Sequence, residues 1–118
     1  MELAGVHHVA ICVDDVDKAI DFYVDVLGCH VREDRPDFGF PGAWLDAGTQ
    51  QIHLMQFTED PKPKGHYALR VDDAEGWAAH LESKSVKHML SPHIEGAGRQ
   101  VFLADPSGNQ IELNQPDH

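Results

Sequence analysis

The sequence predicts an α+β fold built from two paired βαβββ modules, and an internal repeat carries this prediction. Residues 8–15, HVAICVDD, recur as residues 66–73, HYALRVDD, with five of eight positions identical. A second pair of segments, QIHL at 51–54 and QIEL at 110–113, repeats at nearly the same offset. Apolar residues alternate in the first segment of each repeat and recur every three or four residues after it, as in a strand followed by a helix. Since one such module would expose an open sheet face, two are expected to pair within a single domain, residues 1–118.

The first module, about residues 4–57, is expected to open with a strand over residues 6–13. Strand side chains alternate between faces, so Val9, Ile11 and Val13 should pack on a helix while His8 points to the other face. The further expected elements are a helix capped by Asp14 or Asp15 and ended by Gly28, a strand over 29–33, a loop over 34–42 and a hairpin of strands 43–46 and 51–57.

The second module, about residues 66–115, should repeat this order after a Pro- and Lys-containing linker at about residues 58–65. Here His66, Ala68 and Arg70 share one face of the first strand. The further expected elements are a helix capped by Asp72 or Asp73, a short strand over 86–90, a loop over 91–98 and strands over 101–104 and 110–114 joined by the turn DPSGN.

Composition excludes several classes of function. The 118 residues carry 9 Lys and Arg against 20 Asp and Glu, a net charge of −11, which argues against a nucleic-acid or anionic-membrane partner. No run of about 18 apolar residues is present, so no membrane span is expected. The start of the chain lacks the basic and apolar regions of a signal peptide, and the two cysteines form no CxxC motif. We therefore expect a cytoplasmic protein.

Four residues form the candidate metal site: His8, His53, His66 and Glu112. His8 and His66 begin the repeated first strands. His53 and Glu112 occupy equivalent positions in the repeated last strands, where they point to the sheet face opposite to that of the neighbouring apolar residues. If the modules are related by a pseudo-twofold axis, these side chains can converge in one pocket. Imidazoles and a carboxylate suit a divalent first-row metal, and two histidines with one carboxylate make the set associated with Fe(II) oxygen chemistry. His53 is either a fourth ligand or an acid–base group beside the metal.

Three further residues are weaker candidates for substrate binding: Arg70, Arg99 and Cys12. Arg70 either binds a substrate anion through its guanidinium group or pairs with a surface acid such as Asp72. Cys12 either touches the pocket or is a small buried thiol. The large aromatic residues Trp44, Trp77 and Phe102 are expected in the core.

The segments HHVAICVDDVDKAIDFYVDVLG (7–28) and VFLADPSGNQIEL (101–113) resemble the vicinal oxygen chelate superfamily, which includes glyoxalase I, extradiol dioxygenases and bleomycin resistance proteins. The resemblance covers essentially the whole chain. It implies a glyoxalase-like metal-binding cleft between paired βαβββ modules, and a homodimer. His8, His66 and Glu112 match the superfamily's ligand positions, whereas His53 replaces the glutamate of glyoxalase I.

The resemblance leaves three functions open. The first is a glyoxalase I-like isomerase or lyase in which a divalent ion (Fe, Mn, Ni, Co or Zn) binds a small substrate with two adjacent oxygens, and Glu112 or His53 moves a proton. The second is an Fe(II) ring-cleaving dioxygenase with His53 as its acid–base residue. The third is a metal-free drug-binding or resistance protein.

Overall fold

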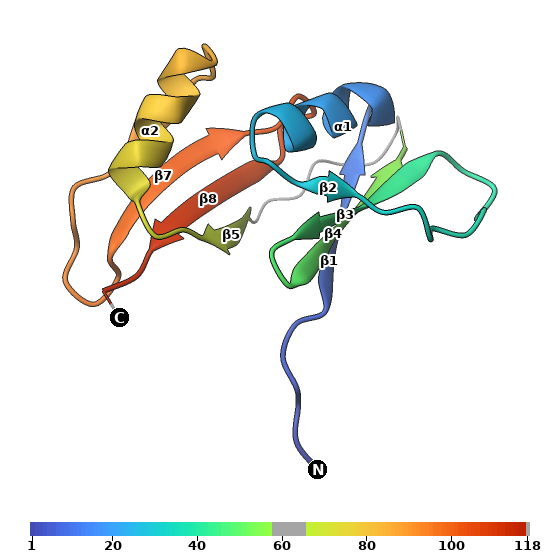
Figure 1. The fold of residues 1–118 in the computed structure, drawn as a ribbon, viewed down its shortest axis with the longest axis horizontal. Coiled ribbons are helices and arrows are strands. Elements are labelled where there is room, and N and C mark those ends of the chain that lie inside the picture. The colour runs from blue at the N-terminus through green and yellow to red at the C-terminus, as the bar shows by residue number, and fades with distance from the viewer. Residues whose placement is uncertain (58–65, 118) are drawn as a thin grey trace. The chain divides into compact units, whose positions relative to one another are not determined.

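The computed structural model describes residues 1–57 and 66–117. The chain divides into two compact units, unit 1 (Met1–Lys62) and unit 2 (Pro63–His118). Each unit holds one helix and one four-stranded sheet (Figure 1). The predicted α+β fold of two βαβββ modules is therefore confirmed. The predicted linker, about residues 58–65, lies outside the described residues, and the assignment to a single domain stays a prediction.

Unit 1 has its last strand beside its first. Its elements are β1 (His8–Val13), α1 (Val16–Asp25), β2 (His30–Val31), β3 (Gly42–Ala47) and β4 (Gln50–Gln56). The strand order is β1-β4-β3-β2, with β1 and β4 parallel and the other pairs antiparallel. Helix α1 covers one face of this sheet, where Tyr23, Leu45 and Ile52 are almost completely buried. Removing these apolar side chains from water stabilises the unit.

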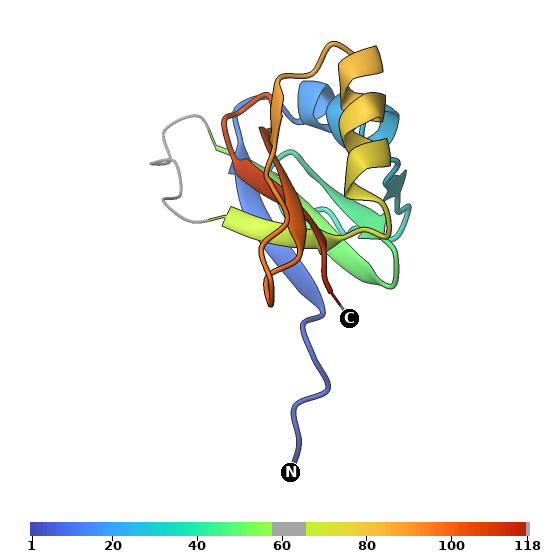
Figure 2. The ribbon, with the colours of Figure 1, turned by 90° about the vertical axis from the view of Figure 1, so that its left-hand side faces the viewer.

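Unit 2 repeats this arrangement. Its elements are β5 (His66–Arg70), α2 (Ala74–Ser83), β6 (His88–Leu90), β7 (Arg99–Ala104) and β8 (Gln110–Gln115). The strand order is β5-β8-β7-β6, again with a parallel pair between the first and last strands. Helix α2, yellow to orange in Figure 2, lies on one side of its sheet, and Leu81, Ile111 and Leu113 are buried.

The two helices begin in the same way. Asp15 is the N-cap of α1 and accepts from the backbone N–H groups of Asp17 and Lys18. Asp73 is the N-cap of α2 and accepts from the backbone N–H of Gly76. In addition, the side chain of Gln56 accepts from the first helical N–H of α1 at 2.9 Å, and Gln115 does the same for α2 at 2.8 Å. Each helix is thus tied to the last strand of its own unit. Among the described residues, no helix is long and apolar enough to span a membrane.

The parallel strand pairs share one register, which places the candidate residues equivalently. The matching partners are His8 with Gln51 and Ala10 with His53 in unit 1, and His66 with Gln110 and Ala68 with Glu112 in unit 2. His8 and His53 are therefore diagonal neighbours on the helix-free face of their sheet, and His66 and Glu112 are diagonal neighbours on theirs.

The strand ends differ from prediction in both units. The first strand begins at His8 and not at residue 6, and the last strands differ by one residue. The strand expected over 29–33 contains only His30 and Val31, and the one expected over 86–90 contains His88–Leu90. Strand β7 begins earlier than expected because Arg99 pairs with Gln115 across the ladder. Local propensity does not fix such ends, since they depend on the length of the partner strand.

Candidate functional site

A histidine and a buried carboxylate meet on the helix-free face of unit 2. The Nε2 atom of His66 lies 3.1 Å from Oε1 of Glu112. Glu112 is only 9% exposed, although it faces away from the helix. Its second oxygen, Oε2, accepts a hydrogen bond from Nδ2 of Asn114 at 2.8 Å. Both carboxylate oxygens are therefore held by neighbouring side chains, which fixes the orientation of the group.

The spacing of this pair suits two ligands of one metal ion. Two donor atoms bound at right angles, each about 2.0–2.2 Å from the ion, lie roughly 3 Å apart. The distance of 3.1 Å between His66 Nε2 and Glu112 Oε1 has that value. The hydrogen bond from Asn114 to Glu112 is the kind of contact that orients ligating carboxylates in metal sites. In the structure the same contact is a hydrogen bond in which His66 Nε2 donates to Glu112, and release of that proton would free both atoms to bind a divalent ion.

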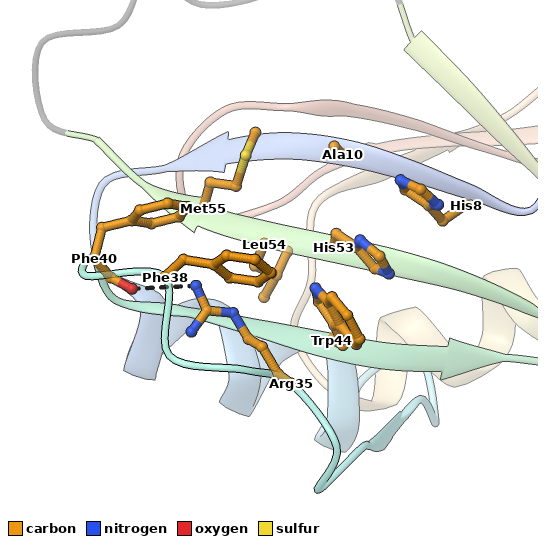
Figure 3. A pocket seen from close by; sticks show the side chains of 9 residues that line it. All are labelled: His8, Ala10, Arg35, Phe38, Phe40, Trp44, His53, Leu54 and Met55. Atoms are coloured by element: carbon orange, nitrogen blue, oxygen red, sulfur yellow. Dashed lines mark hydrogen bonds between the residues drawn. The ribbon is translucent and has the colours of Figure 1, made fainter.

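Two histidines and a tryptophan stack on the equivalent face of unit 1. The rings of His8 and His53 lie parallel, with centroids 3.9 Å apart and planes inclined by 13°. The indole of Trp44 stacks on the other side of His53, at 4.5 Å and 11° (Figure 3). Nε2 of His53 lies 2.8 Å from the amide oxygen of Gln51, so this nitrogen donates and Nδ1 carries the lone pair.

The stacked arrangement does not let both imidazoles of unit 1 bind one ion as they stand. A nitrogen binds a metal in the plane of its ring, and a metal in the plane of one stacked ring lies outside the plane of the other. A shared ligand role for His8 and His53 requires rotation of one side chain. Desolvation by burial and the nearby positive charges of His8, His7 and two arginines lower the pKa of His53. His53 is therefore a neutral base at pH 7.

The four candidate residues thus form two pairs, one in each unit. Within residues 1–57 and 66–117, no three His, Cys, Asp or Glu side chains gather into a group that could hold a metal ion. The assignment of His8, His53, His66 and Glu112 to one centre stays a prediction.

A pocket of about 220 Å³ opens beside the histidine stack of unit 1 (Figure 3). Its wall includes three aromatic residues, Phe38, Phe40 and Trp44, together with Arg35 and His53. Phe38 is 51% exposed, and its ring centroid lies 6.0 Å from those of Phe40 and Trp44. An exposed aromatic wall of this kind is typical of a ligand site.

The two arginines near this pocket differ in their partners. Arg32 is paired with Asp34 at 2.7 Å and with Asp46 at 2.8 Å, and this pairing lowers the pKa of Asp34. Arg35 instead donates to the backbone oxygen of Phe40 at 3.1 Å. Within the described part of the chain, no carboxylate pairs with Arg35. Arg35 is thus the cation of the pocket that is available to a ligand.

The weaker candidates have different environments. Arg70 is exposed, and among the described residues it forms no ion pair. Arg99 pairs with Glu75 and donates to the backbone oxygen of Ser91 at 3.0 Å, so its guanidinium is already engaged. Cys12 is half-buried and is not among the residues that line the pocket of unit 1. The substrate roles of these three residues stay predictions.

Sequence reasoning missed the aromatic wall. Trp44 was expected in the core, but it is half-buried on the helix-free face because its strand partner is His53. Arg35, Phe38 and Phe40 belong to the segment between β2 and β3, which the sequence marks only as a loop. The closely spaced aromatic residues at 38, 40 and 44 were the available signal, since large apolar side chains in a loop need a surface to cover.

Comparisons with known proteins agree with this architecture. Residues 5–113 match the model of the Glyoxalase/Bleomycin resistance protein/Dioxygenase superfamily. The chain is 33% identical to the uncharacterized protein YaeR of Escherichia coli, covering 94% of this chain and 95% of YaeR. It is 28% identical to mouse mitochondrial methylmalonyl-CoA epimerase, covering 97% of this chain and 74% of the epimerase.

The structure also resembles TnmS3, an antibiotic binding protein from Streptomyces sp. CB03234. The two are 30% identical, the match covers 99% of each chain, and the TM-score is 0.83. The match to the family model spans both repeated modules, from β1 to β8. The chain therefore belongs to the Glyoxalase/Bleomycin resistance protein/Dioxygenase superfamily.

Proposed function

We propose that this protein is a metal-dependent vicinal oxygen chelate enzyme, a glyoxalase I-like isomerase or lyase acting on a small substrate with two adjacent oxygens. The observation that carries the proposal is the separation of 3.1 Å between His66 Nε2 and Glu112 Oε1, which suits two ligands of one ion. The similarity to methylmalonyl-CoA epimerase supports chemistry of this type. The proposed ligands are His8, His53, His66 and Glu112, contributed by one chain or by two.

The side chains have separate roles in this proposal. A bound divalent ion supplies Lewis-acid polarisation of the substrate oxygens. Glu112 is oriented by Asn114 and can accept a proton from the carbon next to a substrate carbonyl. His53, held by Gln51 through Nε2, offers Nδ1 as an alternative acceptor, and its lowered pKa keeps it neutral at pH 7. Proton transfer by a positioned group contributes about 10²–10⁴-fold to a rate.

Metal analysis tests the proposal directly. Protein purified without chelator should contain one divalent ion per chain by inductively coupled plasma mass spectrometry. His66→Gln and Glu112→Gln should each lower metal affinity by at least about tenfold, because each removes a proposed ligand. His30→Gln is the matched control, since His30 is exposed and belongs to neither pair. Equal metal content in all four proteins would contradict the ligand assignment.

A substrate panel then separates the chemistries. The protein would be assayed under air with two substrate classes: hemithioacetals formed from 2-oxo aldehydes, and catechols. Each assay would be repeated with Mn, Fe(II), Ni, Co and Zn. The isomerase proposal expects rearrangement of the 2-oxo aldehyde adducts, with loss of activity in Glu112→Gln or in His53→Gln. A yellow ring-fission product formed from a catechol with Fe(II) would instead favour the dioxygenase.

A second candidate function is metal-free binding of a drug-like molecule. The aromatic pocket of unit 1 and the 30% identity to the antibiotic binding protein TnmS3 favour it. This candidate predicts tight binding of a planar aromatic compound by protein that contains no divalent ion. One tightly bound ion per chain would exclude it.

We also propose the homodimer that the superfamily resemblance implies. Light scattering coupled to size-exclusion chromatography should give twice the mass of the 13.1 kDa chain. A mass equal to one chain would contradict the dimer and would require all proposed ligands to come from the same chain.

A further inference from the structure

The aromatic wall beside the histidine stack exposes large apolar side chains to solvent. Phe38 is 51% exposed, and Phe57, whose ring centroid lies 5.1 Å from that of Phe40, is 43% exposed. Covering such surface with a ligand ring removes it from water, which is favourable in proportion to the area covered. The ring of His53 is stacked between His8 and Trp44, so the aromatic surface open to a ligand comes from Phe38, Phe40 and the part of Trp44 that lines the pocket. The wall therefore favours a planar apolar ligand.

The cation Arg35 lies against this wall. Its guanidinium carbon is 5.1 Å from the ring centroid of Phe38 and 5.3 Å from that of Phe40. None of the described residues that line the pocket is an acid, although the chain carries a net charge of −11. A guanidinium has five N–H donors, and the bond to the Phe40 oxygen uses only one of them. The remaining donors can bind a carboxylate.

The position of Arg35 depends on a glycine in the adjacent strand. A Cβ atom at Gly42 would lie 2.7 Å from an Nη atom of Arg35, closer than side chains approach one another. Gly42 therefore gives the guanidinium room to lie against β3. The hydrogen bond to Phe40 orients the guanidinium before any ligand arrives, which lowers the entropic cost of binding.

We propose that this pocket binds a planar aryl carboxylate, with its ring against Phe38, Phe40 and Trp44 and its carboxylate on Arg35. A volume of about 220 Å³ suits one or two fused rings, since a cavity of about 150 Å³ can hold benzene. The carboxylate lies in the plane of the aryl ring, so one flat molecule can reach both the wall and the cation. The inference adds a ligand class to the pocket beside His8 and His53, and its contacts are made by Arg35, Phe38, Phe40 and Trp44, none of which is a proposed metal ligand.

Isothermal titration calorimetry with three probes tests the ligand class. We expect 2-naphthoate to bind with one molecule per chain. Naphthalene-2-carboxamide keeps the ring without the charge, and cyclohexanecarboxylate keeps the charge without the aromatic ring. The carboxamide should bind at least about tenfold more weakly, since a hydrogen bond to a charged group is worth ~1.5–3 kcal/mol. Cyclohexanecarboxylate should also bind more weakly, because its puckered ring cannot stack flat on the aromatic wall. Equal affinity for naphthoate and its carboxamide would overturn the proposal, as would no detectable binding of naphthoate at millimolar concentration.

Variants with matched controls assign the binding to the named residues. Arg35→Gln should weaken naphthoate binding by about tenfold or more, and Phe38→Ala by about threefold or more. Lys18→Gln and Met89→Ala remove an exposed cation and an exposed apolar side chain elsewhere, so both should bind as the unaltered protein does. Thermal unfolding of each variant checks that it is folded. Unchanged affinity in Arg35→Gln would overturn the proposal.

The same titration after chelator treatment separates this inference from the proposed metal site. The affinity for naphthoate should change less than threefold when divalent ions are removed, and Arg35→Gln should retain the metal content of the unaltered protein. Loss of naphthoate binding on chelation would show that the carboxylate binds a metal ion instead of Arg35, and would overturn the inference. If the protein contains no metal ion but still binds naphthoate, the proposal of a metal-dependent enzyme is overturned, whereas the proposed naphthoate site is not.

Discussion

The turn between β7 and β8 depends on Asp105, whose removal should destabilise the protein strongly. Asp105 is 5% exposed, and its Oδ1 accepts from the backbone N–H groups of Ser107 at 2.9 Å and Asn109 at 2.8 Å. Its Oδ2 accepts from Nδ2 of Asn109 at 2.9 Å. Asp105→Ala leaves three buried donors without this acceptor. Hydrogen bonds to charged groups are worth ~1.5–3 kcal/mol each and are not additive, so we expect a loss of about 3–5 kcal/mol.

Urea denaturation followed by circular dichroism measures this loss. The midpoint for Asp105→Ala should fall by roughly 2 M, given m values of 1–3 kcal/mol/M for small proteins. Asp105→Asn keeps one acceptor oxygen but turns an NH₂ group toward Asn109, so about 1–2 kcal/mol should be lost. Asp72→Ala removes an exposed acid and should stay within about 0.5 kcal/mol. A loss for Asp105→Ala no larger than that for Asp72→Ala would refute the assignment of the turn's stability to this carboxylate.

Four further predictions concern local features of the fold. Burial raises the pKa of Cys29 to about 11. In a Cys12→Ser background, Ellman's reagent at pH 8 should therefore react with Cys29 only after the protein unfolds. Fast reaction with the folded protein would contradict the burial. The unfolded thiol loses its proton near pH 9, whereas the folded thiol keeps it up to about pH 11. The contribution of Cys29 to the free energy of unfolding should therefore fall between about pH 9 and 11. Cys29→Ala should flatten the dependence of the unfolding temperature on pH in that range. Gly98→Ala should lower the free energy of unfolding, measured by urea denaturation, by at least about 2 kcal/mol. The φ angle of Gly98 is 80°, and the new Cβ would overlap the backbone oxygen of Gln115. A loss below about 1 kcal/mol would be inconsistent with that overlap. Asp15→Ala should cost about 1 kcal/mol by the same assay because the N-cap bonds to the first turn of α1 are lost, whereas Asp15→Ser should recover most of it.

Much of the fold was predictable because the sequence repeats. The two repeated segments predicted the first and last strands of each module, whereas the parallel pairing that places His8 near His53 and His66 near Glu112 came only from the structure. The alternation of side chains then determined the face on which each residue lies. Asp15 and Asp73 were predictable as N-caps because short acids before an apolar helical stripe satisfy exposed N–H groups.

The sequence did not reveal the contacts that shape the site. Stacking of Trp44 on His53 depends on the antiparallel pairing of β3 with β4, which local propensity does not determine. Arg35 and Phe38 reach the pocket from an irregular segment whose path follows tertiary contacts alone. The parallel stack of His8 and His53 could not be expected from ligand-type residues at equivalent positions, because the repeat fixes backbone register but not side-chain rotation.

The two modules present different chemistry from the same backbone position. In unit 1 this position holds His53 opposite Trp44, and in unit 2 it holds Glu112 opposite Phe102. A neutral imidazole can stack on an indole, so unit 1 keeps an aromatic surface beside a proton acceptor. A buried carboxylate cannot be stabilised in this way and needs donors, which Asn114 and the adjacent histidine supply. The exchange of one residue between the copies therefore places an imidazole among aromatic rings in unit 1 and a hydrogen-bonded carboxylate in unit 2.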